Sequence, residues 1–259
     1  MPSAEDVFSE TFGRFMKNWG FISSLRQFID VAFPIASEAL AAVHGQLIEQ
    51  VAADPEYKKI IVKLDGSEGT WDQEIKAFFQ SGMTDNAMTN ARIAIDGASL
   101  VFAQSILDDC AWSYLRVCAL AAPADWDAVL KDKKVAFSAA GKSQEDLRQT
   151  LIDEKLEDLE WDSLLKKVDL LFQLCTPPKD FAPINNYEYD RSHLKAIDDA
   201  RHAIIHRDGM GQPIPQIEEE LEYISKTANF LMGLVNNKYG VQLNVIKVMN
   251  LPVTPVPDL

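Results

Sequence analysis

Three of the four histidines in this 259-residue chain fall within residues 190–209, which read DRSHLKAIDDARHAIIHRDG. The segment places Arg201, His202 and His206 within six consecutive residues. A histidine can transfer protons near neutral pH, and a guanidinium can hold two phosphate oxygens at once. Together these groups are the minimum needed to cleave a phosphodiester without a metal ion.

Two other interpretations of the same residues compete with catalysis. A helix here would bury one apolar stripe, formed by Leu194, Ile197, Ala200, Ile204 and Ile205. Arg201 falls inside that stripe, and because a buried unpaired guanidinium is costly, it needs a carboxylate partner or an anionic ligand. Asp198, His202 and His206 share the neighbouring face and are candidates for zinc or iron ligands. No second ligand-rich helix accompanies them, so we expect neither a metal nor another cofactor.

The elements that must position these residues are expected to be helices, because most of the chain has a 3.6-residue apolar period. We expect a short helix that ends near Gly20, and a second over 23–53 that Pro34 could interrupt. A helix over 71–80 precedes a long one that Asn86 caps and Pro123 ends. Further helices are expected over 143–162, 161–174, 191–207 and 214–240. The runs 58–64 and 241–248 are candidates for one short two-stranded β element.

At Arg201–His206 the sequence resembles the R-x4-H signature of HEPN domains (higher eukaryotes and prokaryotes nucleotide-binding). The surrounding order is also similar: the amphipathic helix WDSLLKKVDLLFQL, a loop, the motif helix and another long helix. The resemblance implies an all-α fold with a HEPN-like helical bundle at 86–240. Residues 1–85 would then form an N-terminal helical extension of unknown role, and 241–259 a short strand and a disordered Pro-rich tail.

The resemblance also implies a function and a homodimer whose motif helices face each other. Many HEPN members are metal-independent endoribonucleases of toxin–antitoxin or anti-phage systems. Arg201 would stabilise the charge on the phosphate, and His206 would move protons while the ribose 2′-OH attacks, leaving a 2′,3′-cyclic phosphate. His202, Asp198 and Asp199 would support the site. Lys195 and Arg207 are the candidates for further contacts with the RNA.

Two features depart from an active, toxin-like member. Toxins that are silenced by modification carry a tyrosine two residues after the histidine, where this chain has Asp208. The chain has 25 Lys and Arg against 39 Asp and Glu, and its net charge of −14 repels nucleic acid at long range. The alternative is a non-catalytic HEPN-like binding or regulatory module, whose acidic segments 143–162 and 218–222 would engage a basic partner. An antitoxin or regulatory protein is a candidate partner of the chain.

Compartment and cysteine usage are consistent with either function. The first residues, MPSAEDVFSE, lack the basic and apolar regions of a signal peptide. Charged residues interrupt the long apolar helices, so no membrane span is expected. The 3 cysteines form no CxxC and indicate neither a disulfide framework nor a thiolate zinc site. The sequence therefore predicts a cytoplasmic protein without a membrane partner.

Overall fold

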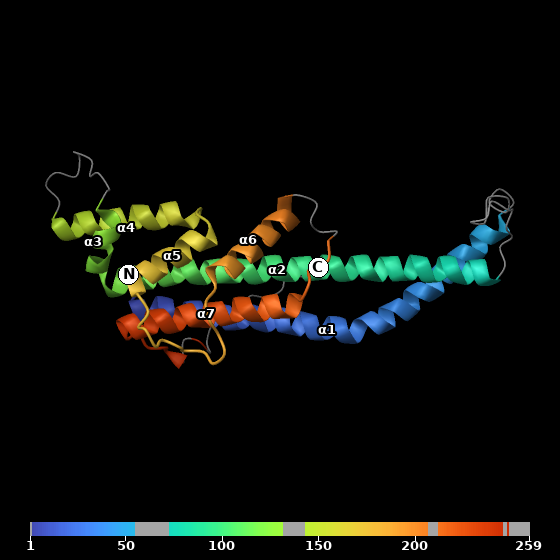
Figure 1. Ribbon diagram of the computed structural model, residues 1–259, viewed down its shortest axis with the longest axis horizontal. Coiled ribbons are helices and arrows are strands. Elements are labelled where there is room, and N and C mark those ends of the chain that lie inside the picture. Colours follow the sequence, from blue (N-terminus) through green and yellow to red (C-terminus); the bar gives the residue numbers. More distant parts are fainter. Residues whose placement is uncertain (1, 55–72, 132–142, 207–211, 246–247, 249–259) are drawn as a thin grey trace. The chain divides into compact units, whose positions relative to one another are not determined.

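A computed structural model describes residues 2–54, 73–131, 143–206, 212–245 and 248, and every regular element within these ranges is helical (Figure 1). The helices are α1 (Ala4–Ala53), α2 (Gln73–Ala121), the 3-10 helix η2 (Pro123–Trp126), α3 (Asp127–Leu130), α4 (Gln144–Glu160), α5 (Leu164–Cys175), α6 (Arg191–His206) and α7 (Ile217–Tyr239). The all-α prediction is confirmed.

The predicted β element is not present in the described part of its two runs. Residues 241–244 have no regular structure and Val245 is helical, while the run 58–64 and the tail 249–259 lie outside the described residues. Side chains, in place of a neighbouring strand, form hydrogen bonds with the backbone of residues 241–244. Asn236 Nδ2 donates to the Val241 carbonyl at 2.6 Å, and the Asn244 amide donates to Ser9 Oγ at 2.8 Å.

The predicted helix ends near Gly20 and before Asn86 do not occur, because α1 and α2 each run through these positions without a break. A glycine inside a helix costs only about 1 kcal/mol relative to alanine, which packing along a long helix offsets. Asn86 does not cap a helix either, since its side-chain oxygen accepts a hydrogen bond from Asn90 Nδ2 at 3.2 Å. Pro34 also lies inside α1 without ending it.

The chain divides into two compact units, and the predicted boundary between residues 85 and 86 falls inside α2. We call Met1–Phe21, Ser99–Gly209 and Pro215–Leu259 the main unit, and Ile22–Ala98 with Met210–Ile214 the hairpin unit. In the hairpin unit α1 and α2 pack antiparallel: Glu49 pairs with Lys76 at 2.6 Å, and His44 Nδ1 with Thr84 Oγ1 at 2.9 Å. Farther along, Arg26 forms a buried ion pair with Asp96.

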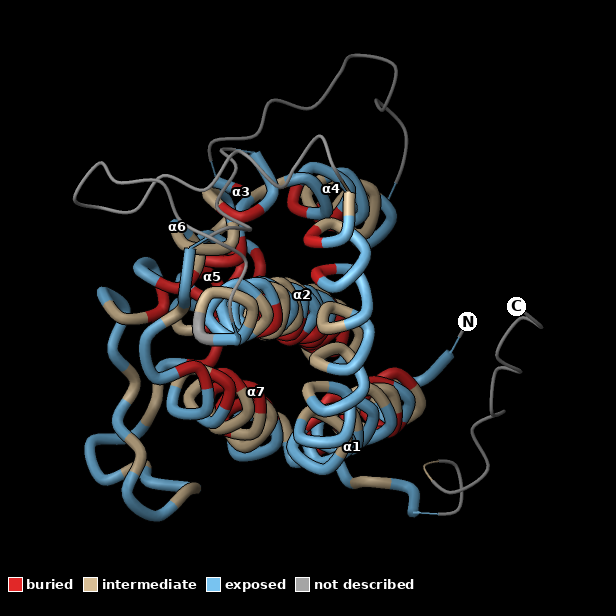
Figure 2. Tube along the Cα trace, turned by 90° about the vertical axis from the view of Figure 1, so that its right-hand side faces the viewer, coloured by how far each residue is buried: buried red, intermediate tan, exposed pale blue. Residues whose placement is uncertain are grey.

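In the main unit the later part of α2 is the central helix. The start of α1 and α7 lie on one side of it, and α4, α5 and α6 lie on the other (Figures 1 and 2). The largest fully buried aliphatic and aromatic side chains come from all of these layers: Phe8, Leu100, Leu107, Tyr114, Leu115, Trp126, Ile152, Leu171, Leu194, Ile224 and Leu231. Burying them is the main force that fixes α6 against its neighbours.

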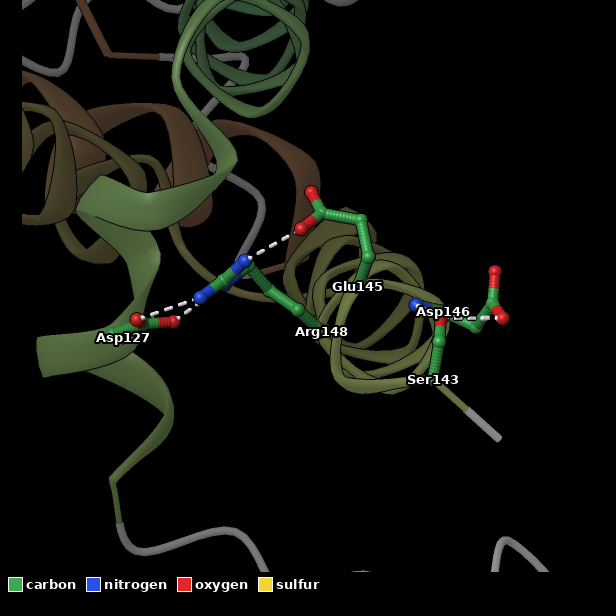
Figure 3. Close-up of polar contacts among 5 residues, drawn as sticks. All are labelled: Asp127, Ser143, Glu145, Asp146 and Arg148. Carbon is green, nitrogen blue, oxygen red and sulfur yellow. Dashed lines mark hydrogen bonds and ion pairs between the residues drawn. The ribbon is translucent and has the colours of Figure 1, made fainter. Parts of the chain in front are cut away.

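Helix α4 is attached to α3 by one arginine. Arg148 Nε donates to Asp127 Oδ1 at 2.7 Å, and a second guanidinium nitrogen donates to Glu145 Oε2 at 3.0 Å (Figure 3). The hydrogen bonding from Arg148 to Asp127 lowers the pKa of the Asp127 carboxyl. At the start of α4, Ser143 Oγ accepts from the Asp146 amide at 3.1 Å (Figure 3). Because two carboxylates occupy its guanidinium, Arg148 is a structural residue.

Among the described residues, one helix has the length and composition to cross a membrane, whereas the sequence led us to expect none. Helix α1 contains an 18-residue stretch with a mean hydropathy of 1.3, and 6% of that stretch is buried. Length and composition alone are weak evidence for a membrane span, because helices of other kinds meet the same criterion.

Candidate functional site

The end of the loop before α6 is bonded to α7, and the first turn of α6 is bonded to α5. The Asp190 amide donates to Tyr223 Oη at 3.0 Å, and Tyr223 Oη donates to the Asp190 carbonyl at 2.8 Å. Asp190 Oδ1 accepts from the Ser192 amide at 2.7 Å, and Arg191 pairs with Asp169 of α5 at 2.8 Å. The first turn of α6 is thereby held between α5 and α7.

The last turns of α6 are packed on one side only. Leu194, Ile197 and Ile204 are buried as predicted, but Ile205 is 47% exposed. The predicted stripe was therefore too wide: Ile205 stands one residue beyond Ile204, about 100° around the helix, past the edge of the packed side. The exposed side carries His202 and His206.

His202 and His206 form a contacting pair on this exposed side. Both side chains are exposed, and their ring centroids lie 4.6 Å apart. The ring nitrogens of both histidines have no hydrogen-bond partner among the residues that the structure describes. Two imidazoles with open nitrogens can each donate or accept a proton from a bound substrate.

Arg201 stands at the edge of the packed side and is only loosely paired. Its Nε lies 3.5 Å from Asp198 Oδ1, and this is the one ion pair that the described residues give it. The Nε atom is buried and makes no hydrogen bond with any described residue. Asp198 Oδ1 instead accepts from Gln104 Nε2 of α2 at 2.6 Å. Asp198 thus links Gln104 to Arg201, and the guanidinium of Arg201 makes no hydrogen bond with a described residue.

A cavity of about 140 Å³ opens beside these residues. Its lining consists of Gln104, Ser105, Asp108, Asp162, Ser163, Leu164, Asp198 and Arg201. Two buried polar atoms at the cavity lack a described partner, the acceptor Gln104 Oε1 and the donor Arg201 Nε. Unpaired buried groups are costly, so both atoms favour the entry of a polar ligand or of water.

The carboxylates of the cavity are partly neutralised by lysines. Lys167 Nζ lies 2.7 Å from Asp108 Oδ2, and Lys166 Nζ lies 2.5 Å from Asp162 Oδ1. Sequence reasoning placed Asp162 in the acidic segment 143–162 but not in this site, and it missed Asp108 and Gln104. The signal that could have found Gln104 and Asp108 is their spacing of four residues on one face of an otherwise apolar helix.

The other predicted site residues are distributed as follows. Asp199 pairs with Lys195 at 2.5 Å on the surface of α6, apart from the cavity lining. Arg207 and Asp208 lie outside the described residues. Among the described residues, no group of three His, Cys, Asp or Glu side chains is close enough to hold a metal ion. Asp198, His202 and His206 are therefore not arranged as a metal site. The structure thus forms two pairs on successive turns, Asp198 with Arg201 and His202 with His206.

Comparisons of the chain with protein-family models, with curated proteins and with solved structures find no match. The chemistry of this site must therefore be inferred from α6 and its neighbours alone.

Proposed function

We propose that this chain is a metal-independent endoribonuclease of the HEPN type that acts as a homodimer. The observation that carries the proposal lies on α6. Arg201, whose buried Nε makes no hydrogen bond with a described residue, is followed one and five residues later by two exposed imidazoles that also lack a described hydrogen-bond partner. Cation, acid and base are the groups that transesterification of RNA needs. An antitoxin or regulatory protein is the expected partner of such an enzyme.

In the proposed reaction each proton has a defined donor and acceptor. Neutral His206 takes the proton of the ribose 2′-OH, and the 2′-oxygen attacks the adjacent phosphorus. The bond between phosphorus and the 5′-oxygen breaks, and a protonated imidazole, His202 or the second chain's copy of His206, gives that oxygen a proton. The products are a 2′,3′-cyclic phosphate and a 5′-hydroxyl. No metal ion is required, because Arg201 compensates the charge that develops on the phosphoryl oxygens.

Asp198 has a positioning role in this scheme. Its Oδ1 accepts a hydrogen bond from Gln104 Nε2 at 2.6 Å and lies 3.5 Å from Arg201 Nε. A carboxylate on the Nε side orients a guanidinium while the terminal nitrogens remain available for a bidentate contact with phosphate. The same carboxylate reduces the local positive charge, so we expect binding of RNA to be modest and sensitive to salt.

Cleavage of tRNA and total RNA in EDTA tests the proposal. We expect Arg201→Ala and His206→Ala each to lower the cleavage rate by about 100-fold or more. The matched controls are Arg191→Ala and His193→Ala, which remove the same residue types from the same helix at sites bound to Asp169 and Glu220. Cleavage that needs a divalent ion, or that all four variants retain equally, would refute the proposal.

The acidity of the cavity favours a second candidate, the non-catalytic binding module. Asp108, Asp162 and Asp198 line the same cavity as Arg201, and the chain carries a net charge of −14. Such a module would bind a basic partner through α4, where Glu154 and Glu157 are exposed. Binding of a Lys/Arg-rich peptide that the double substitution Glu154→Lys with Glu157→Lys abolishes, in a chain that cleaves no RNA, would favour this function.

A further inference from the structure

The hairpin unit exposes a row of apolar side chains on α1, which we call the outer stripe: Phe28, Val31, Ile35, Ala39 and Ala42. The three large members are 68%, 69% and 67% exposed. Single exposed apolar residues are ordinary, but a continuous row over four helical turns marks a contact surface.

The outer stripe faces away from α2. At about 100° per residue, the stripe is centred about 150° around α1 from the buried side that carries Ile22, Arg26 and Ile29. That buried side meets α2 through polar pairs, Arg26 with Asp96 and His44 with Thr84. Part of the contact inside the hairpin is thus polar, and an apolar row lies on the outside of α1, where an isolated hairpin in water would carry polar residues.

The spacing of the stripe is symmetric about Ile35. Successive members are three, four, four and three residues apart, so the pattern reads the same in both chain directions. A two-fold contact between identical helices is self-complementary, and antiparallel helices place residue 35 + n opposite residue 35 − n. We propose that the outer stripe is the contact surface for a second copy of this chain, with the two α1 helices antiparallel about an axis at Ile35.

The residue sizes fit this arrangement. Phe28 lies opposite Ala42 of the second copy, Val31 opposite Ala39, and Ile35 opposite its own copy. Large side chains thus meet small ones, which allows two helices to pack closely without voids. The only acidic residue at the edge of the stripe is Glu38, and the two copies of Glu38 stand about 9 Å apart along the axis, at 1.5 Å per residue.

A membrane is a poorer partner for this surface. Residues 28–45 contain the acidic residues Asp30 and Glu38, and no lysine or arginine occurs between Arg26 and Lys58. Helices that bind lipid surfaces place lysine and arginine beside their apolar face, and a chain with a net charge of −14 is repelled by anionic lipids. The proposed contact is also independent of the nuclease chemistry, because it uses no residue of α6.

Cysteine cross-linking of the full-length chain tests the register. We expect Ile35→Cys alone to form a disulfide-linked dimer on mild oxidation, because residue 35 meets its own copy. Phe28→Cys alone and Ala42→Cys alone should not cross-link, since like positions stand about 21 Å apart along the axis and disulfides need Cα atoms within about 7 Å. An equal mixture of Phe28→Cys and Ala42→Cys should cross-link efficiently.

The native cysteines give little background in this experiment. Cys110, Cys118 and Cys175 are free and buried. Burial raises the pKa of the Cys110 and Cys118 thiols, which disfavours their reactive thiolates. The hydrogen bond with Cys118 lowers the pKa of Cys175, but the two sulfur atoms face each other at 3.7 Å inside the core of the main unit, whereas the outer stripe belongs to the hairpin unit. The antiparallel register would be overturned if Phe28→Cys alone cross-linked as fast as Ile35→Cys. It would also be overturned if the mixture of Phe28→Cys and Ala42→Cys gave no cross-link.

Equilibrium sedimentation of Ile35→Glu provides the second test. We expect this substitution to weaken self-association at the stripe by about 100-fold, because it places two carboxylates at the centre of an apolar contact. Phe78→Glu is the control, an equally drastic change at an exposed aromatic of α2 in the same unit. A native chain that stays monomeric at 29.0 kDa, or that floats with neutral lipid vesicles unless Ile35 is replaced, would refute the proposal.

Discussion

Each unit contains a buried or half-buried arginine beside an aspartate, and the two pairs differ in how completely they are formed. In the hairpin unit, Arg26 and Asp96 are in direct contact, with side chains only 8% and 12% exposed. In the main unit, Arg201 stays 3.5 Å from Asp198 with a side chain that is 36% exposed, and its buried Nε makes no hydrogen bond to a described residue. The comparison teaches that a closed pair holds two helices together, whereas a loose pair keeps a cation available for a ligand.

The largest effect is expected from removing the closed pair. Arg26→Ala leaves the buried Asp96 carboxylate with only the more distant Arg92, at 3.5 Å, as a cationic partner, which costs about 3 kcal/mol of unfolding free energy. Urea unfolding measures this loss. Arg92→Ala is the control, because Arg92 is half-buried and reaches Asp30 at 3.2 Å and Asp96 at 3.5 Å, and its removal should cost about 1 kcal/mol or less.

The double substitution Arg26→Met with Asp96→Leu sharpens the first prediction. Replacing both charges by apolar groups of similar size removes the desolvation cost, so most of the lost stability should return. Equal destabilisation by the single and the double variants would show that packing, and not charge pairing, explains the role of Arg26.

An intermediate effect is expected at Lys167, whose side chain is 2% exposed and whose partner Asp108 is 38% exposed. Lys167→Met keeps the apolar stem and removes the ammonium group. Water can reach Asp108 after the change, so we expect a loss of about 1–2 kcal/mol in urea unfolding. RNA cleavage should fall as well, because the uncompensated Asp108 faces the cavity of Arg201. A stability loss above that of Arg26→Ala would contradict this order.

A smaller effect on stability is expected from Arg201→Ala. The pair with Asp198 is loose and only half-buried, so it contributes about 1 kcal/mol or less, and the unfolding midpoint in urea should move little. Cleavage of RNA should be lost in the same variant, as proposed above. If Arg201→Ala lowered the unfolding free energy as much as Arg26→Ala does, the guanidinium would be a structural group in both units.

The smallest effect concerns the exposed pair of Arg148 and Asp127, and it depends on pH. Because Arg148 lowers the pKa of Asp127, the pair stabilises the folded chain above the ordinary aspartate pKa of 3.8. That stability is lost as the pH falls through the lowered pKa. Asp127→Asn should therefore lower the melting temperature slightly at pH 7, with a difference that disappears in strong acid. A constant difference at every pH would assign the effect to another cause.

The sequence predicts the kind of element better than its length. The apolar period identifies α5, α6 and α7, because each buries one face and Pro or Gly follows near its end. It fails at Gly20 and Asn86, since local residue preferences of about 1 kcal/mol are small against the packing of a 50-residue helix. The β-like alternation of 241–248 fails for a similar reason: Val241 is buried and its carbonyl is bonded by Asn236.

The site shows the same limit. Arg201, His202 and His206 are recognised from their types and spacing on one helix. Gln104, which binds Asp198, lies 94 residues earlier in the chain, and a single sequence carries no signal for such a contact. The exposure of Ile205 could not be predicted either, because the width of a buried face depends on which helices cover it.

The way the two units share the chain determines the order in which they can fold during synthesis. All but five residues of the hairpin unit lie in the first 98, whereas the main unit joins Met1–Phe21 to Pro215–Leu259. Ser9 receives its hydrogen bond from Asn244 only after 235 further residues have been made. The outer stripe therefore emerges from the ribosome well before the motif helix, and we expect neighbouring nascent chains on one messenger RNA to pair before either has acquired a complete α6.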